Sequence, residues 1–395
     1  MAVKEKSKTM DKILLVIKEP YLDKIPSLMS LLRYFSLKGV GVTILSVVAD
    51  EYPLPSFDGY PNVTFLKIGQ KRTKFSLPTS FRLLFGALRH IVTVLSREKR
   101  YDCIIGSGSH GNLAAFLVAK ITGSMYVNYC IEYPAFRNTG SEPYTVTDWL
   151  YNNIALKKAD NIVTFDDTHV DLIADNIGID PSRFLKLPNA KLGEVFDGDS
   201  DMIRAKFGIP REKTVILHSG GLGVWFRSAE VAEASKTWPE NRVLVFHTSH
   251  KAVGDEYYKA MSAIDYGGRV AFSVTPVPSG KLDEFVASAD IGLAWYNKDV
   301  LGYRAEFMGQ AAGKIGDYLK CGLPVITNNF HSLSSYIRKY DCGLCVDSIL
   351  DIGGAVDRIL SDYRRYRENA FLCYEELWKP DSYLENIYRK VFENG

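Results

Sequence analysis

Short apolar runs alternate with amphipathic stretches along most of the chain. The runs typical of buried strands lie at residues 12–17, 42–48, 62–68, 101–105, 125–131, 159–165, 184–187, 214–218, 242–247, 270–274, 289–296 and 325–327. Segments with helical spacing of apolar residues stand between many of them, for example at 25–37, 112–122 and 168–177. This alternation predicts parallel sheets covered by helices, an α/β architecture.

The strand–helix–strand pattern begins twice, at Lys12 and again at Thr214. A chain of 395 residues is too long for one typical hydrophobic core and long enough for two. We therefore expect two doubly wound domains rather than one large sheet.

Composition is that of an ordinary globular protein, with 46% hydrophobic and 24% charged residues. The six cysteines are scattered, several of them in apolar runs, as in a protein that keeps its thiols reduced. No apolar run approaches the length of a membrane span, and residues 1–12 are too polar for a signal peptide. These features predict a cytoplasmic protein.

Residues 313–327 combine an amphipathic helix, a Gly-Leu-Pro turn and a short buried strand. Lys314 and Asp317 are three residues apart and share the polar face of this helix. A cation and a carboxylate beside a buried strand suit a nucleotide, with the lysine on phosphate and the aspartate on ribose hydroxyls. The same spacing also fits an ordinary surface pair.

The segment Lys314-Ile-Gly-Asp317-Tyr-Leu-Lys-Cys-Gly-Leu-Pro-Val-Ile326 resembles a signature of GT-B glycosyltransferases, K-x-x-E-Y-x-x-x-G-x-P-V-I, particularly of the family 4 type. The resemblance implies that Lys314 lies near the donor diphosphate and Asp317 at the ribose. The chain departs from the pattern twice. Asp317 replaces the usual Glu, and the family's other Glu falls at Gly309, with Glu306 close by as a substitute at the donor sugar.

The resemblance also implies the architecture: two Rossmann-like domains that face a central cleft. Residues 1–190 would bind the acceptor and residues 191–377 the donor, with the hinge at Pro188-Asn-Ala190. A last helix, at about 378–395, would cross back to the first domain. Enzymes of this type retain the anomeric configuration and need neither metal nor cofactor, only the donor, here a UDP- or GDP-sugar. We expect a glycan or lipid-linked acceptor in bacterial envelope polysaccharide biosynthesis, and no nucleic-acid partner.

A glycine-rich turn follows the first strand of the second half. Gly220, Gly221 and Gly223 would let backbone N–H groups approach a phosphate at the start of the next helix. Arg227 stands where the family places a basic residue on the diphosphate, although a solvent-facing arginine fits as well. Val277 lies in a segment that resembles the family's contact to the nucleotide base.

The first half carries a second glycine pattern, Gly106-Ser-Gly108-Ser-His110-Gly111, with Glu132 about 20 residues further on. This is the G-x-G-x-x-G fingerprint of NAD binding, so an NAD-dependent oxidoreductase remains an alternative. By resemblance to the glycosyltransferases, His110 would instead contact the acceptor or reacting sugar, and Glu132 would act on the acceptor. A catalytically inactive assembly partner is a third interpretation, because Gly309 lacks the family's carboxylate.

Residues 71–100 concentrate positive charge, with eight Lys or Arg and one acid. One interpretation is a domain helix that buries its apolar face. The other is an edge that docks on anionic lipid through Lys74, Arg82 and Arg89, which would place the protein on the inner face of the plasma membrane. A further acidic segment, Asp197-Gly-Asp-Ser-Asp201, has the spacing of a metal motif but reads as a solvated linker, so we expect no metal site.

Overall fold

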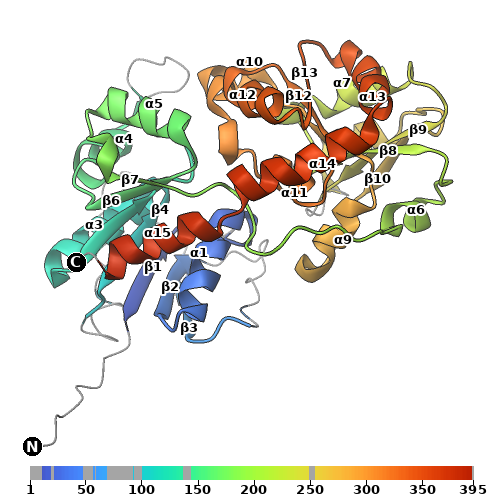
Figure 1. Ribbon diagram of the computed structural model, residues 1–395. Helices are drawn as coiled ribbons and strands as arrows, with labels where there is room; N and C mark the ends of the chain where they lie inside the picture. The colour runs from blue at the N-terminus through green and yellow to red at the C-terminus, as the bar shows by residue number, and fades with distance from the viewer. Residues whose placement is uncertain are drawn as a thin grey trace, which may run out of the picture. The chain divides into compact units, whose positions relative to one another are not determined.

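The computed structural model describes residues 11–18, 22–47, 57, 59–68, 92, 100–136, 144–248 and 254–393. The chain forms two compact units, one of residues 1–192 with 380–395 and the other of residues 193–379 (Figure 1). Lys74, Arg82 and Arg89 lie outside the described residues, so their role stays a prediction.

The first unit is built on a sheet of seven parallel strands in the order β3-β2-β1-β4-β5-β6-β7. Their bounds are β1 Lys12–Ile17, β2 Gly41–Val47, β3 Val63–Ile68, β4 Cys103–Ser107, β5 Met125–Tyr129, β6 Asn161–Thr164 and β7 Phe184–Lys186. The central strands β1 and β4 are buried along nearly their whole length, which explains their continuous apolar runs.

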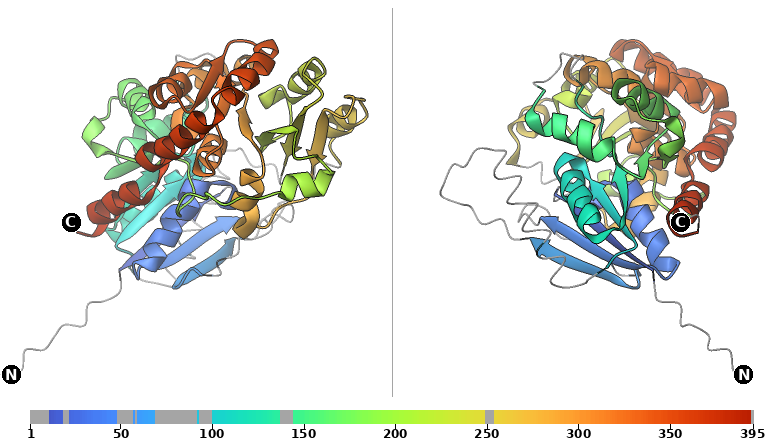
Figure 2. Two further views of the ribbon diagram at one scale, coloured as in Figure 1. Left: turned by 45° about the vertical axis from the view of Figure 1, so that its right-hand side comes forward. Right: turned by 90° about the vertical axis from the view of Figure 1, so that its left-hand side faces the viewer.

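Helices cover both faces of this sheet (Figure 2). They are α1 Pro26–Leu37, α3 Gly108–Thr122, α4 Val146–Leu150, α5 Asp167–Ile177 and α15 Asp381–Phe392. Shorter turns lie at Leu22–Lys24 and Pro181–Arg183, and α4 continues directly into a π-helical turn, Tyr151–Leu156.

The last helix, α15, packs on α1 although the two are far apart in sequence. Its buried residues Leu384, Ile387 and Val391 join the hydrophobic core of the first unit. Phe35 of α1 meets the Tyr388 ring edge-on at 5.9 Å between centroids. At the rim, Glu385 accepts hydrogen bonds from Tyr34 and from Lys38, the latter at 2.9 Å. Residues 380–395 are therefore a structural part of the first unit.

The second unit repeats the design with six parallel strands in the order β10-β9-β8-β11-β12-β13. Their bounds are β8 Thr214–Ser219, β9 Arg242–His247, β10 Val270–Ser273, β11 Ile291–Ala294, β12 Val325–Asn328 and β13 Gly343–Val346. Two parallel, helix-covered sheets confirm the predicted α/β class.

The helices of the second unit are mostly short. They are α6 Met202–Phe207, α7 Ser228–Ser235, α8 Glu256–Ser262, α9 Leu282–Ala287, α10 Lys298–Leu301, α11 Gly313–Lys320, α12 His331–Tyr340, α13 Ile352–Leu360 and α14 Tyr363–Cys373. Single turns of 3₁₀- or π-helix lie at Val224–Phe226, Ser279–Lys281, Gly302–Phe307, Gly309–Ala311, Ile349–Asp351 and Tyr374–Trp378.

Glycine and charged residues recur in residues 297–313, a pattern that predicts a polar loop. This prediction is wrong, because the structure folds most of the segment into α10 and two 3₁₀ turns. Buried Ala305, Gly309 and Gln310 anchor these turns, and the Gln310 side chain donates 2.7 Å to the backbone oxygen of Leu377.

The strand order of each sheet reverses at one point, between β1 and β4 in the first unit and between β8 and β11 in the second. In open parallel sheets, ligands bind beyond the carboxyl ends of the strands at such a switch point. We therefore expect ligand-binding residues in the segments that follow Ile17 and Ser107 in the first unit, and Ser219 and Ala294 in the second.

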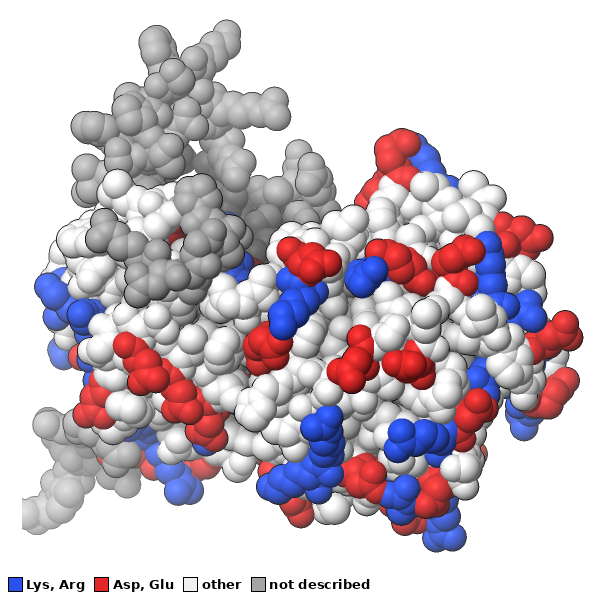
Figure 3. Space-filling view, turned by 90° about the horizontal axis from the view of Figure 1, so that it is seen from above, with Lys and Arg blue, Asp and Glu red and all other residues white. Residues whose placement is uncertain are grey.

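The described surface carries mixed charge. In Figure 3, blue and red side chains are interspersed over the face seen from above. No helix in the described part of the chain is both long and apolar enough to cross a membrane.

We predict that Ile387→Ala destabilises the first unit by about 2–5 kcal/mol, because it leaves a cavity between α15 and the sheet. Asn386→Ala, one residue away on the exposed side of α15, should change stability by less than about 0.5 kcal/mol. Urea unfolding of the full chain measures both variants. Equal, small effects would mean that α15 adds little to the core.

Candidate functional site

The switch point of the second unit carries the glycine-rich turn. Directly after β8, the backbone N–H of Gly220 donates to the His247 carbonyl at 2.9 Å, and Gly220 has a φ of +119°. A side chain is excluded at Gly221 as well, because a Cβ there would lie 2.5 Å from the Phe226 ring. The turn therefore needs glycine at both positions to bend sharply over the end of the sheet.

Lys314 extends from α11 to this turn. Its ammonium nitrogen lies 3.3 Å from His218 Nε2, at the end of β8, and 3.9 Å from the centroid of the Phe226 ring. A second ring, that of Tyr296, has its centroid 5.2 Å away. A Cβ added at Gly220 would stand 3.6 Å from the same nitrogen. The ammonium thus lies directly over the glycine turn, between two aromatic rings.

The surroundings of Lys314 disfavour its charge. Although the residue as a whole is half-buried, burial of its ammonium group lowers the pKa of Lys314 to about 7. Among the described residues, Lys314 forms no salt bridge with a carboxylate. Burial, followed by the nearby Lys314 charge, also holds the pKa of His218 well below its usual value, so this imidazole is neutral. The site is therefore cationic and short of a counter-charge.

Tyr318 fixes the position of α11 relative to the sheet. Its hydroxyl accepts a hydrogen bond from the backbone N–H of Ser219 at 2.7 Å and donates to the Leu293 carbonyl at 3.1 Å. The ring lies so close to Gly292 that any Cβ there would collide with it. One buried side chain thereby ties α11 to β8 and β11 on both sides of the switch point.

Arg227 ends the turn and precedes α7. It has a left-handed backbone, with φ of +49° and ψ of +42°, which costs a non-glycine residue about 1 kcal/mol. Its guanidinium donates to Glu230 at 3.1 Å, and 42% of its side chain is exposed. Arg227 is the N-cap residue of α7, which begins at Ser228, so the arginine precedes the helix instead of lying inside its first turn.

The remaining donor candidates are distributed around the same unit. Asp317 lies one turn beyond Lys314 on α11 and is half-buried. Val277, also half-buried, lies in the segment after β10. The structure does not assign a ligand to either, so their roles at ribose and base stay predictions.

Glu306 is already engaged by protein groups. Its carboxylate forms a 2.5 Å salt bridge with Lys298 and accepts a 3.4 Å hydrogen bond from the backbone N–H of His331, the first residue of α12. The hydrogen bond from Lys298, followed by that from His331, lowers the pKa of Glu306. Gly309 offers no side chain, and its N–H donates to Ser332 Oγ at 3.0 Å. Neither position presents a free carboxylate.

A hollow of about 120 Å³ lies at the switch point of the first unit. His110, from the first turn of α3, lines it together with Gly108, Glu132, Tyr133 and Tyr151. Burial lowers the pKa of His110 to about 4, with a smaller contribution from Lys18, so its ring is neutral near pH 7. The structure therefore brings His110 and Glu132 to one hollow, as a neutral imidazole and an exposed carboxylate.

A buried chain of hydrogen bonds connects Tyr151 with Gly108, and both residues line this hollow. Tyr151 donates to Asn128 at 3.1 Å, Asn128 to the Tyr126 hydroxyl at 3.1 Å, and that hydroxyl to Asn112 at 3.0 Å. Asn112 Nδ2 in turn donates to the Gly108 carbonyl at 3.0 Å. Such a satisfied polar network fixes the start of α3 and the Tyr151 wall in one arrangement.

The glycines of the G-x-G-x-x-G pattern have packing roles. A Cβ at Gly106 would stand 2.5 Å from the Asn112 backbone, and one at Gly111 would stand 2.6 Å from the Val16 carbonyl. The helix α3 begins at Gly108, so two of the three glycines lie inside it rather than in a phosphate-binding loop. Close helix–strand contact accounts for Gly106 and Gly111 without a dinucleotide.

Sequence reasoning missed the residues that surround the lysine. His218 could have been found as a polar residue that ends an apolar strand at a domain's first turn. Tyr318 was recognised only as an apolar position, although it adjoins Asp317 in the signature. Phe226 and Tyr296 gave no signal, because their approach to Lys314 depends on how α11 packs.

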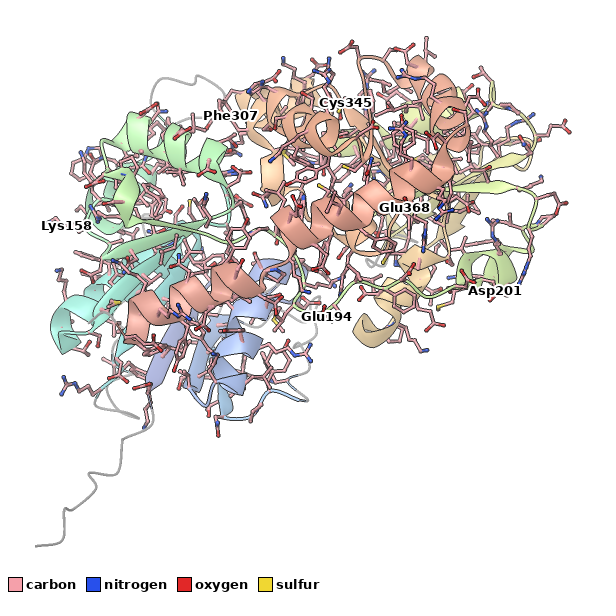
Figure 4. All side chains as sticks on the ribbon, in the orientation of Figure 1. Lys158, Glu194, Asp201, Phe307, Cys345 and Glu368 are labelled. Carbon is pink, nitrogen blue, oxygen red and sulfur yellow. The ribbon has the colours of Figure 1, made fainter. Side chains whose placement is uncertain are left out.

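The acidic segment at residues 197–201, which precedes α6, is not arranged as a metal site in the structure. Asp197 pairs with Arg367 at 2.9 Å, and Asp201 lies at the start of α6 (Figure 4). Across the described residues, no group of three or more His, Cys, Asp and Glu side chains is arranged to hold a metal ion.

Both the sequence and the fold of this chain are similar to those of known proteins. Residues 253–381 match the family model "Glucosyltransferase 3-like, C-terminal domain". A D-inositol 3-phosphate glycosyltransferase from Rhodococcus opacus is 26% identical over 218 residues, which are 53% of this chain and 46% of that protein. The chain thus spans about half the length of the curated relatives that it matches.

Solved structures match almost the whole chain. The Anabaena protein Alr3699/HepE, in complex with UDP and glucose, has a TM-score of 0.72 at 12% identity, covering 97% of this chain and 100% of its own. The sucrose-phosphate synthase of Thermosynechococcus elongatus has a TM-score of 0.71 at 14% identity, covering 98% and 100%. The chain therefore has the two-domain GT-B fold of these structures, and residues 253–381 are similar to a glucosyltransferase 3-like C-terminal domain.

Proposed function

We propose that the protein is a glycosyltransferase that takes its sugar from a nucleoside diphosphate sugar bound by the second unit. The observation that carries the proposal is the buried ammonium of Lys314, which lies over the glycine turn at the switch point without a carboxylate partner among the described residues. A diphosphate supplies the missing negative charge, and the backbone N–H groups of the turn supply hydrogen bonds.

The same groups would act during bond cleavage. The bond between the sugar's anomeric carbon and the diphosphate oxygen breaks, and its electron pair leaves with the nucleoside diphosphate. The acceptor hydroxyl oxygen forms the new bond to the anomeric carbon, and its proton passes to the departing diphosphate or to water. Negative charge then grows on the leaving group, where Lys314, Arg227 and the amides of Gly221 and Leu222, within the Gly220–Gly223 turn, would stabilise it. The Gly220 and Gly223 amides already donate to His247 and Ser228.

The remaining donor contacts follow the arrangement along the second unit. Asp317 would accept hydrogen bonds from the ribose, and the segment around Val277 would contact the base. Glu306 would reach the donor sugar only by leaving Lys298 and α12, so we expect that its part in sugar recognition is minor.

The acceptor would bind to the first unit. The hollow that contains His110 and Glu132 offers a neutral ring able to donate or accept a hydrogen bond, and a carboxylate able to accept from hydroxyls. Tyr133 and Tyr151 add aromatic walls, as is common in sites that hold sugars. We propose a glycan or lipid-linked acceptor in envelope polysaccharide synthesis, at the inner face of the plasma membrane through Lys74, Arg82 and Arg89.

The donor class has support from the comparisons. Alr3699/HepE was solved with UDP and with UDP-glucose, and the Rhodococcus relative is a glycosyltransferase. We therefore propose a UDP- or GDP-sugar as donor, with retention of configuration and without a metal or further cofactor. A thermal-shift panel of UDP-, GDP-, ADP- and CDP-sugars tests this, because a ligand of the native state raises the melting temperature. No shift with any of them would contradict donor binding.

Lys314→Met is the sharpest test of the site. Methionine keeps the packing against Phe226 and Tyr296 and removes the charge. We expect a loss of donor affinity of about 10- to 100-fold, as for a charge-assisted hydrogen bond of about 1.5–3 kcal/mol. The melting temperature should stay equal or rise, because a buried cation is removed. Isothermal titration of both forms decides it, and unchanged affinity would remove Lys314 from the donor site.

Lys314 should also couple donor binding to pH. Its pKa is about 7 in the free protein, and a bound diphosphate raises it. Binding then takes up a proton above pH 7, so donor affinity should fall by up to about tenfold per pH unit between pH 7 and the pKa of the complex. Below pH 7 the lysine is already charged and this dependence should vanish. Titrations in buffers of different ionisation enthalpy measure the proton uptake, which Lys314→Met should abolish.

Arg227→Asn separates binding from catalysis. Asparagine tolerates the left-handed backbone at this position, so the turn should keep its shape. If the guanidinium meets charge that develops during cleavage, kcat should fall more than donor affinity does. Arg227→Lys, which keeps the charge, should recover part of the rate. A loss confined to donor affinity would make Arg227 a binding residue only.

Asp317→Asn keeps the shape of the side chain and weakens its acceptance of hydrogen bonds from ribose. Affinity for the nucleotide should fall by about tenfold, while affinity for inorganic pyrophosphate, which has no ribose, should stay the same. Competition between nucleotide and pyrophosphate, carried out with the wild type and with the variant, measures the two affinities. An equal loss for both would show that Asp317 acts on the turn rather than on the ribose.

A further inference from the structure

A second, larger hollow lies in the first unit, lined by other residues than the hollow that contains His110 and Glu132. Its volume is about 240 Å³. Its walls come from α4, from the π-helical turn that follows, and from the end of α5. The side chains that matter are three asparagines, two aromatic residues and one lysine: Asn152, Asn153, Asn176, Tyr144, Trp149 and Lys157.

The three asparagines are oriented alike by the backbone. In each, Nδ2 donates to a carbonyl oxygen: Asn152 to Ala135 at 2.8 Å, Asn153 to Trp149 at 3.0 Å, and Asn176 to Leu172 at 2.8 Å. Asn152 Nδ2 also donates to the Tyr144 hydroxyl at 3.4 Å, so both of its N–H groups are used and its Oδ1 remains as an acceptor. Asn153 and Asn176 each keep one N–H and the Oδ1. Hydroxyl groups, which both donate and accept, match these amides.

Asn152 gives the strongest indication of a missing partner. The residue is only 3% exposed, and its buried Oδ1 has no hydrogen-bond partner in the part of the chain that the structure describes. An unpaired buried carbonyl costs about 1–3 kcal/mol, so native proteins rarely keep one without use. A hydroxyl group that entered the hollow could remove this cost after a small shift of the amide.

The aromatic and charged residues narrow the ligand further. Trp149 is 49% exposed, although an indole is among the side chains that gain most from burial. Its flat face suits the C–H face of a sugar ring. Lys157 is exposed, and the described residues that line the hollow include no carboxylate. Figure 4 marks the neighbouring Lys158, which follows this helical segment. Hydroxyl donors, a flat apolar face and an acidic group describe a uronic acid or a similarly charged pyranose.

The two hollows of the first unit have no lining residue in common, but residues close together in the chain line them. Tyr151 lines the first, and its chain neighbour Asn152 lines the second; Pro134 lines the first and Phe136 the second. The π-helical turn at Tyr151–Leu156 thus separates two adjacent hollows, and π-helical turns are frequent at functional sites. A glycan longer than one sugar could contact both.

We propose that the second hollow is a distal acceptor subsite that binds an acidic pyranose unit of the acceptor glycan. The subsite rests on the proposed glycosyltransferase function for its role, because it positions a longer acceptor whose terminal sugar lies in the first hollow. Binding of the glycan itself does not require the donor.

The test is an array of neutral and uronate-containing oligosaccharides, probed with the full-length protein and its variants. The wild type should bind uronate-containing glycans, and Trp149→Ala should lower this binding by about tenfold, the effect of removing a central aromatic contact. Trp149→Phe should retain most of it. Lys157→Gln should reduce binding of the uronate glycans and leave neutral ones unchanged.

Val146→Ala is the matched control. Val146 lies on the same helix and is 68% exposed but does not line the hollow. Glycan binding should survive this change. If Val146→Ala and Trp149→Ala lose binding alike, the helix acts as a general apolar surface, such as one for lipid, and the subsite is wrong. Absence of any glycan whose binding depends on Trp149 would also overturn it.

Failure of the subsite and failure of the enzyme function give different results. Lys314→Met should lose the donor and keep glycan binding. If the wild type binds uronate glycans through Trp149 but never transfers sugar, the hollow is a glycan site and the acceptor role is overturned. If the wild-type protein transfers sugar to long and short acceptors equally, and Trp149→Ala changes the KM of neither acceptor, the second hollow is not an acceptor subsite.

Discussion

A buried ammonium group that pairs with no carboxylate among the described residues is the constraint on which the second unit's site depends. Lys314 lies between two aromatic rings, with a neutral histidine as its nearest polar neighbour, and its pKa is about 7. This arrangement costs folding free energy, because burial disfavours the charged form. An anion in the glycine turn would offset this cost, which is why we propose that the site binds a diphosphate.

The scaffold maintains this arrangement through a small number of close contacts. Tyr318 joins α11 to the ends of β8 and β11, and Gly292 leaves room for its ring. The left-handed backbone of Arg227 then directs the chain from the turn into α7. In the first unit a buried chain of hydrogen bonds, from Tyr151 to Gly108, has the corresponding role at the hollow. Both units thus position polar groups at the switch point of a parallel sheet.

Much of the fold could be predicted from sequence, because apolar runs and helical periodicity are local and regular. The glycine turn and His110 with Glu132 could also be located, since they follow strands, whereas Lys314 was found by its resemblance to a family signature. The roles of these residues stay predictions. What the sequence could not provide depends on packing. The contact of Lys314 with the Phe226 ring joins segments that are distant in the sequence. The salt bridge between Glu306 and Lys298 joins residues that are separated by a turn. The glycines of the G-x-G-x-x-G pattern likewise read as a nucleotide loop, because sequence does not reveal that α3 contacts β1 so closely.

A crystal structure of the protein with UDP tests the central claim most directly. The account predicts the diphosphate over Gly220–Gly223, with an oxygen within hydrogen-bonding distance of Lys314 Nζ, and with Tyr318 still bonded to Ser219. Nucleotide bound instead at Gly106–Gly111 of the first unit, or an ordered diphosphate that does not contact Lys314, would contradict it.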